Sequence, residues 1–282
     1  MSEFIERVDS SVYETDSPVS YAVADGIASV SMNRSTFGNA QNSQMTYALD
    51  EAFKRAVNDD AVKVIVLRGE GKHFSAGHDI GTPGRDINKV FERTQLLWDH
   101  SNKPGGEFLY VREQEVYLGM CRRWRELPKP TIAMVQGACV AGGLMLAWVC
   151  DLIVASDDAF FQDPVVRMGI PGVEYFAHPY EMNPRIAKEF LMTGDRMSAG
   201  RAYDVGTLNV IRLGSIKCTW KCSGVPWGIS ANFGGSPISL VYWAPLTFSL
   251  SVSTISRALF ESLSLMITRS SFPSHSPALE IL

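Results

Sequence analysis

The sequence is short of the features that would place a protein outside the cell or on nucleic acid. Its five cysteines form no paired framework, which favours a reducing compartment over a disulfide-stapled secreted fold. Lys and Arg number 26 against 30 Asp and Glu, so there is no excess of positive charge to bind a polyanion. The N-terminal segment carries Glu3, Glu6 and Asp9 and no apolar run, which argues against a secretory signal. We therefore expect a cytoplasmic protein that binds no nucleic acid.

The last quarter of the chain is short of charge. Residues 215–282 hold six of the 56 Asp, Glu, Lys and Arg residues, and residues 223–256 hold none. Serine shows the reverse, with 15 in the last 68 residues against 13 in the first 214. The length and apolarity of residues 236–256 would allow a membrane-tethered chain, but glycine and proline interrupt the charge-free stretch, so we do not expect a membrane span. Two compositional regimes therefore share one chain.

The first regime alternates strand and helix patterns. Extended runs at residues 19–23 and 27–32 flank an Asp25-Gly26 dipeptide, which predicts a hairpin. Buried strands are predicted at residues 62–67 and 131–135, and helices at residues 110–127 and 144–149 and from a Ser43 cap onward. This alternation predicts an α/β fold with crossover connections.

Two glycine-bearing turns follow the two buried strands. They are residues 73–80 (HFSAGHDI) and residues 136–143 (QGACVAGG), and the second leads into a helix. Glycine lets a ligand approach the backbone closely, and amides at a helix start have no intrahelical partner. Two such turns side by side could form a two-amide pocket for an oxyanion. Ordinary turn chemistry is the alternative interpretation of each one.

Together these segments resemble the enoyl-CoA hydratase/isomerase (crotonase) superfamily. Residues 62–69 (VKVIVLRG) and 74–79 (FSAGHD) are similar to its first signature. Residues 129–133 (KPTIA) with Gly142-Gly143 and Cys150-Asp151 are similar to the second, and residues 191–196 (LMTGDR) to the stretch that follows. The resemblance covers about residues 18–210.

This resemblance implies a spiral of ββα units and an acyl-CoA thioester as the partner. Two backbone amides, by position those of His78 and Gly142, would polarise the thioester carbonyl and stabilise an enolate, in fatty-acid or related acyl-CoA metabolism. It implies no metal or redox cofactor, because coenzyme A enters as part of the substrate, and it implies a homotrimer or hexamer. The implied substrate-binding residues are Ala76, Gly77, His78, Asp79, Ile80, Gly142 and Gly143.

The sequence lacks the two glutamates that hydratases of this superfamily use to position water and move protons. Met145 and Val165 stand at those positions. Neither side chain exchanges protons, so hydration by the two-glutamate route is not expected. The open reactions are isomerisation, hydration by other residues and thioester hydrolysis. A catalytically inactive member that binds acyl-CoA or a partner protein is the alternative.

Other carboxylates lie close by in the sequence. Glu174, between Val173 and Tyr175, is the first candidate for the general base, since apolar neighbours raise a carboxyl pKa; the alternative is a loop glutamate on the surface. Asp163 is the second candidate, unless it caps the turn before Pro164. Three weaker candidates are Glu113, His178 and the side chain of His78.

The tail departs from the superfamily, whose corresponding region is charged and helical. We therefore divide the chain into an acyl-CoA-binding domain, residues 1–206, and an atypical Ser-rich tail, residues 207–282, which we expect to be poorly structured. The hypothesis is that a frameshift or mis-assembled gene end begins near residues 207–215.

Overall fold

The computed structural model describes residues 17–80, 91, 93, 102–170 and 172–213, together with the backbone of three short strands beyond them. Residues 1–16 and most of the expected loop 81–108 lie outside the described residues. Most of the region 207–282 does so too, so the prediction of a poorly structured tail stays a prediction.

A six-stranded sheet runs through the described domain in the order β1-β2-β3-β4-β6-β9. β1 (Val19–Ala24) and β2 (Ile27–Met32) form the predicted antiparallel hairpin. Asp25 and Gly26 both have positive φ, as the tight turns that join strands of this twist require. The next strands are parallel to β2 and to one another: β3 (Val64–Gly69), β4 (Thr131–Val135), β6 (Leu152–Ser156) and β9 (Val210–Arg212).

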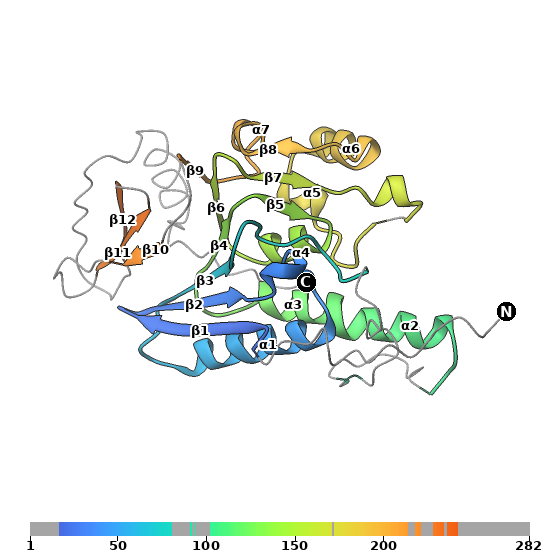
Figure 1. Ribbon diagram of the computed structural model, residues 1–282, viewed down its shortest axis with the longest axis horizontal. Coiled ribbons are helices and arrows are strands. Elements are labelled where there is room, and N and C mark those ends of the chain that lie inside the picture. The colour runs from blue at the N-terminus through green and yellow to red at the C-terminus, as the bar shows by residue number, and fades with distance from the viewer. Residues whose placement is uncertain are drawn as a thin grey trace, which may run out of the picture.

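A second sheet has the order β5-β7-β8, with bounds Ala138–Val140, Phe160–Gln162 and Met197–Ser198. Each of its first two strands follows a strand of the large sheet and precedes helix: β4 and β5 lead into α4 (Gly142–Trp148). Likewise β6 and β7 lead into η4 (Val165–Met168), α5 (His178–Glu181) and α6 (Pro184–Thr193). Figure 1 shows these strands ascending through the molecule. The predicted spiral of ββα units is confirmed.

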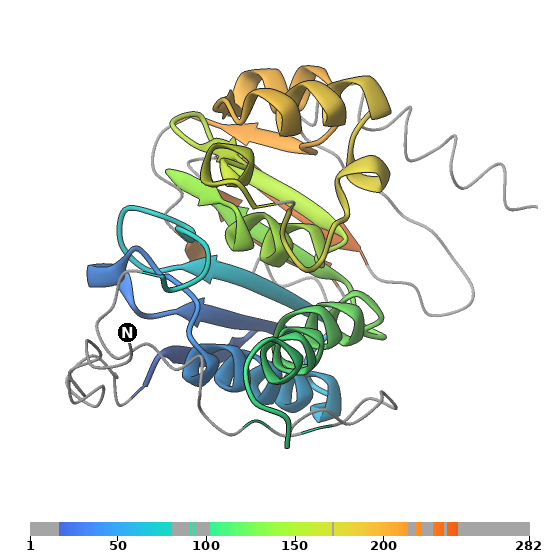
Figure 2. The same ribbon diagram turned by 90° about the vertical axis from the view of Figure 1, so that its right-hand side faces the viewer.

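Helices cover the two ends of this stack. α1 (Ser43–Asn58) packs against β1 and β2, and α7 (Ala199–Asp204) lies near β9. Seen from the side, α1 lies at one end and the gold-coloured α5 and α6 at the other (Figure 2). Asn42, and not Ser43, caps α1, because its extended backbone lets Oδ1 accept a hydrogen bond from the Met45 amide at 2.9 Å.

The helix predicted at residues 110–127 begins earlier and is interrupted. α2 (Gly106–Glu113) runs into the π-helical segment η3 (Gln114–Gly119) and then α3 (Met120–Arg125). Trp124 fixes α3 on α1: its indole donates to Asp50 at 2.8 Å and its ring packs 5.3 Å from that of Phe53. Apolar periodicity cannot distinguish a π turn from an α turn, so no sequence pattern indicates η3.

Three short strands beyond the domain form a separate antiparallel sheet: β10 (Cys218–Trp220), β11 (Gly228–Phe233) and β12 (Ser236–Val241). β12 covers the start of residues 236–256, the segment whose length and apolarity would allow a membrane tether, and the rest of that segment lies outside the described residues. In the part of the chain that is described, we find no helix with the length and apolarity needed to cross a bilayer.

Candidate active site

The segment at residues 74–79 lies between two others and is bonded to both. On one side it pairs with residues 38–41: Gln41 accepts from the Asp79 amide at 2.8 Å and donates to Gly77 at 2.7 Å. On the other side Ser75 pairs with residues 138–140, accepting from Val140 at 3.0 Å. Backbone groups alternate in direction along an extended chain, so the N–H of His78 points away from Gln41 and toward the side of β5.

The glycine turns after β3 and β5 touch each other. Gly77 has φ +97°, and a Cβ placed there would lie 2.8 Å from the carbonyl oxygen of Val140 and 3.2 Å from the amide nitrogen of Gly142. A Cβ at Gly143 would lie 2.6 Å from the carbonyl oxygen of Ser75. Real Cβ atoms do not come this close to backbone, so only glycine fits at both positions.

Two backbone amides at this contact lack an acceptor in the part of the chain that the structure describes. Among the described residues, none accepts a hydrogen bond from the amide of His78 or from that of Gly142, the first residue of α4. Buried amides are almost always paired, so two unpaired ones at one turn contact are an unusual feature.

Ala141 sets the direction of the second amide. Its φ of 47° and ψ of −112° lie outside the regions that L-residues normally adopt. Hydrogen bonds hold it on both sides, since its amide donates to Gln162 and its carbonyl accepts from Leu144, both at 2.9 Å. Such strain persists only where the surrounding structure imposes it, and it is concentrated at functional sites.

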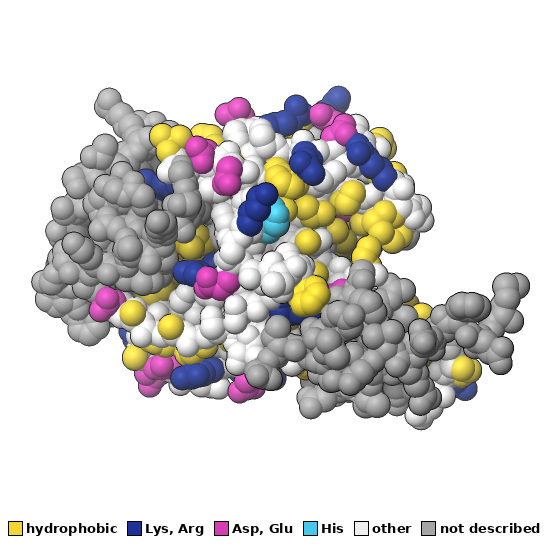
Figure 3. Space-filling model, viewed as in Figure 1, with side chains coloured by type: hydrophobic (Ala, Val, Ile, Leu, Met, Phe, Trp, Pro, Cys, Tyr) yellow, Lys and Arg dark blue, Asp and Glu magenta, His cyan; other side chains and the backbone are white. Residues whose placement is uncertain are grey.

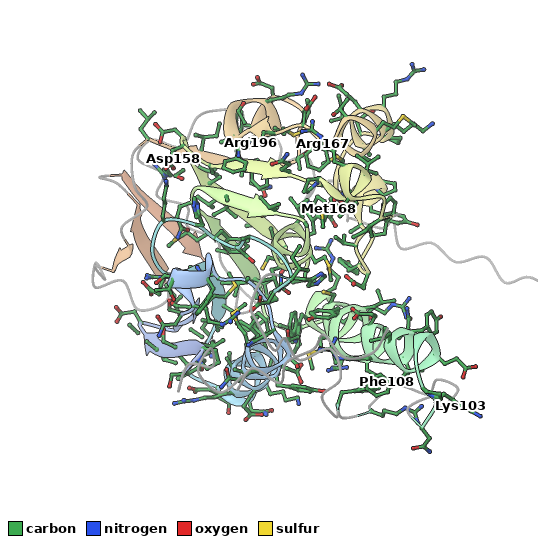
Figure 4. The ribbon with its side chains drawn as sticks, turned by 45° about the vertical axis from the view of Figure 1, so that its right-hand side comes forward. Lys103, Phe108, Asp158, Arg167, Met168 and Arg196 are labelled. Carbon is green, nitrogen blue, oxygen red and sulfur yellow. The ribbon has the colours of Figure 1, made fainter. Side chains whose placement is uncertain are left out.

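Three titratable side chains meet beside these amides. Glu174 Oε2 lies 3.5 Å from His78 Nε2, and the Glu174 and Glu113 side chains are joined by a hydrogen bond. A Cβ at Gly142 would lie 2.9 Å from the same His78 Nε2, so the cluster adjoins the turn contact. Figure 4 labels one residue in or beside each of the two segments that supply these carboxylates: Phe108 lies on α2, which ends at Glu113, and Met168 lies on η4, which precedes Glu174.

Burial changes the protonation of this cluster. It raises the pKa of Glu113 to about 7, and the hydrogen bond to Glu174 and the Glu174 charge act in the same direction. Burial also lowers the pKa of His78 to about 4, so the imidazole is neutral at physiological pH. The site therefore has no histidine cation to balance its carboxylates.

Three further residues belong to this environment and were not predicted. The Tyr117 ring, on η3, packs 4.2 Å from the His78 ring. Gln41 is buried, and its Nε2 would lie 3.1 Å from a Cβ at Gly142. Arg112 donates to Glu113 Oε1 at 3.2 Å. No local pattern marks these residues, because their role depends on contacts between distant segments.

Asp163 and His178 form a second group. Both side chains are fully buried, and His178 Nε2 lies 2.9 Å from Asp163 Oδ2. Aromatic rings surround the pair, with Trp148 4.3 Å and Phe176 4.8 Å from the His178 ring. Asp163 Oδ1 also accepts a hydrogen bond from the Val165 amide at 3.3 Å. Asp163 therefore caps the turn at Pro164, which is the structural alternative to a role as general base.

The remaining predicted residues differ in exposure. Ala76 and Ile80 are exposed, whereas the Asp79 carboxylate is bound by the buried Arg34 at 2.9 Å. Met145 is fully buried on α4, and Val165 is buried at the start of η4. Within the described ranges no cluster of His, Cys, Asp and Glu side chains is suited to hold a metal ion.

Exposed apolar side chains gather near this site. They come from η4 and the segment around α5, and Figure 3 shows apolar side chains on this part of the surface. They are Val166, Met168, Ile170, Phe176 and Tyr180, together with Met192 on α6.

The family model for enoyl-CoA hydratase/isomerase matches residues 22–102 and 108–212. This protein therefore belongs to the enoyl-CoA hydratase/isomerase family, and the predicted resemblance is confirmed.

Individual relatives agree with this assignment. The chain is 42% identical over 199 residues to the Mycobacterium tuberculosis protein named "Putative enoyl-CoA hydratase EchA13", covering 67% of this chain and 61% of that protein. It is 32% identical to 4-chlorobenzoyl coenzyme A dehalogenase-2 of an Arthrobacter species, covering 69% of this chain and 66% of the dehalogenase. The crystal structure of a probable enoyl-CoA hydratase from Mycobacterium smegmatis superposes with a TM-score of 0.60 at 46% identity, covering 69% of this chain and 72% of that one. The chain thus spans less than two thirds of the length of these curated relatives.

Proposed function

We propose that this protein binds an acyl-CoA thioester and stabilises its enolate with the backbone amides of His78 and Gly142. Glu174 acts as the general base at the α-carbon. The reaction class is isomerisation of the acyl double bond.

The observation that carries the proposal is the pair of unpaired amides at the contact of the two glycine turns. Removal of an α-proton from a thioester places negative charge on the carbonyl oxygen. Fixed N–H donors stabilise that charge without reorganising, and each is typically worth about 3 kcal/mol. Any side chain at Gly77 or Gly143 would collide with the neighbouring backbone. The glycines therefore let the two turns, and with them the two amides, lie in contact.

The choice of Glu174 rests on its neighbours. Of the candidate carboxylates, Glu174 and Glu113 lie beside the turn contact, whereas Asp163 is enclosed with His178. Met145 and Val165 offer no proton-exchanging group, which favours isomerisation over hydration by two glutamates.

The names of the relatives support the ligand class. The 4-chlorobenzoyl coenzyme A dehalogenases and the enoyl-CoA hydratases are named for coenzyme A thioesters. A shared thioester handle is the chemistry that a two-amide oxyanion site would recognise. Assembly into trimers or hexamers and a cytoplasmic location remain predictions from the resemblance and the composition.

The test is conversion of a 3-enoyl-CoA to the conjugated 2-enoyl-CoA, followed by the absorbance of the conjugated thioester. We expect turnover by the full chain and a loss of at least 100-fold in kcat for Glu174→Gln, because the amide cannot accept the proton. Glu189→Gln is the matched control, since this exposed glutamate pairs with Arg201 on the surface. Equal activity of the two variants would overturn the assignment of Glu174.

A non-catalytic acyl-CoA-binding member is the second candidate, favoured by Met145 and Val165 and by the altered tail. Calorimetric titration with several acyl-CoAs separates the two. Tight binding without turnover of any of them would establish this second candidate.

A further inference from the structure

We propose that Glu113 and Glu174 share one proton, and that Glu113 donates it to Glu174 and so positions the Glu174 carboxylate as the base. This inference rests on the proposed function, which needs Glu174 to be ionised and fixed. Glu113 is a positioning residue here, because it acts through Glu174. In effect the protein builds a two-carboxyl centre from residues other than the two positions where hydratases of the family carry glutamate.

The geometry brings two distant segments together. Glu113 is the last residue of α2, immediately before the π-helical segment η3, and Glu174 lies in the connection between η4 and α5. Their side chains are hydrogen-bonded directly. Two carboxyl groups can form such a bond only when one of them carries a proton.

The groups that face the pair decide how many protons it holds. Arg112 donates to Glu113 Oε1 at 3.2 Å. On the other side stand the neutral His78 and the buried thiol of Cys121, whose pKa is raised by burial and by the Glu174 charge. Arg112 is therefore the one cation in direct contact among the described groups that face the pair. One cation supports one carboxylate, so the second keeps its proton.

The proposed role follows from the proton balance of the reaction. The Glu174 carboxylate takes a proton from the α-carbon, and the C–H electron pair moves onto the thioester oxygen as the enolate forms. The same proton is then delivered to the γ-carbon, and the double bond moves from the β,γ to the α,β position. No proton, electron or co-reactant is gained or lost. Throughout, the Glu113 proton stays in the hydrogen bond that orients Glu174.

The sign of the pH dependence is fixed by this arrangement. Below about pH 7 Glu113 is protonated and holds Glu174. As the pH rises through that value the pair becomes a dianion, the hydrogen bond is lost and the two charges repel. Isomerase activity should therefore fall roughly 25-fold between pH 6.5 and 8.5, the factor given by titration of one group with a pKa of about 7.

The decisive variant is Glu113→Gln. Its side-chain amide donates to Glu174 at every pH, so we expect kcat near the wild-type value at pH 6.5 and a change of less than about threefold up to pH 8.5. Glu113→Ala, which has no donor, should lose activity at all pH values. A Glu113→Gln variant that keeps the wild-type decline above pH 7 would overturn the inference.

A second measurement does not depend on turnover. Infrared difference spectra of the ligand-free full chain should show a protonated carboxyl band that disappears as the pH rises through about 7, and that is missing in Glu113→Gln. If the band is present but the protein has no isomerase activity, the shared proton is supported and the proposed function is rejected. If the protein turns over substrate but shows no such band, the proposed function is supported and the shared proton is rejected.

Discussion

At the scale of single residues, the site depends on positions where a side chain is absent. Gly77 and Gly143 leave no space for a Cβ, because backbone oxygens of the facing turn occupy it. The sequence allowed these glycines to be predicted as site residues, since each follows a buried strand. It also put forward Glu174, whose apolar neighbours indicated burial.

Other residues could not be predicted in this way. Gln41 and Tyr117 come near His78 or Gly142 only through contacts between segments far apart in the chain. Glu113 is one of the candidates that the sequence offers, but its contact with Glu174 depends on tertiary structure that no periodicity encodes.

Asp163 allows a test of structure against catalysis at one residue. Replacing it with Ala leaves the fully buried His178 without its partner, so we expect a loss of about 2–4 kcal/mol in the free energy of unfolding. Urea titration measures this loss. The kcat of the folded fraction should stay within about threefold of wild type.

The control for this change is Asp195→Ala, which removes an exposed carboxylate paired with Arg167 and should alter stability by less than about 0.5 kcal/mol. If Asp163→Ala kept its stability and lost its turnover, Asp163 would be catalytic.

At the scale of elements, the turn between β5 and α4 and the segment η3 shape the site. The hydrophobic pattern decides here whether a segment forms a strand or a helix. For this reason β3, β4 and α4 lie close to where the sequence predicts them. The early start of α2 and the π-helical turn of η3 do not follow from it. Rare π turns are often found at functional sites, and this one lies between Glu113 and α3.

The strain at Ala141 gives a prediction for this turn. Glycine tolerates positive φ, so Ala141→Gly should relieve about 1–3 kcal/mol of strain against about 0.5–1 kcal/mol of added chain entropy. We expect a net gain of about 1 kcal/mol in the free energy of unfolding, measured by denaturant titration.

The same substitution at Ala187, inside α6, is the control and should destabilise by about 1 kcal/mol or more, because glycine is a poor helix former. A loss of stability at both positions would show that Ala141 is not strained.

At the scale of the whole molecule, the family match and the composition change at nearly the same place. The family model ends at residue 212, and residues 215–282 hold only six charged side chains. The change in composition can be seen in the sequence alone, because charge content is a local property. How the tail packs against the domain depends on tertiary contacts, and composition does not specify these.

The frameshift hypothesis makes a prediction at this scale. The encoding DNA, read in the other two frames from about residue 207 onward, should give a charged, amphipathic helical pattern in one of them. Sequencing the gene from an independent template checks the reading frame. If neither alternative frame gives such a pattern, the tail belongs to the protein as it stands.

The central claim is that the two unpaired amides converge on one thioester oxygen. A crystal structure of the full chain with a bound acyl-CoA tests it most directly. We expect the thioester oxygen about 2.7–3.1 Å from the nitrogens of both His78 and Gly142, with the Glu174 carboxylate nearest the α-carbon. A bound thioester whose oxygen meets neither nitrogen would contradict the account.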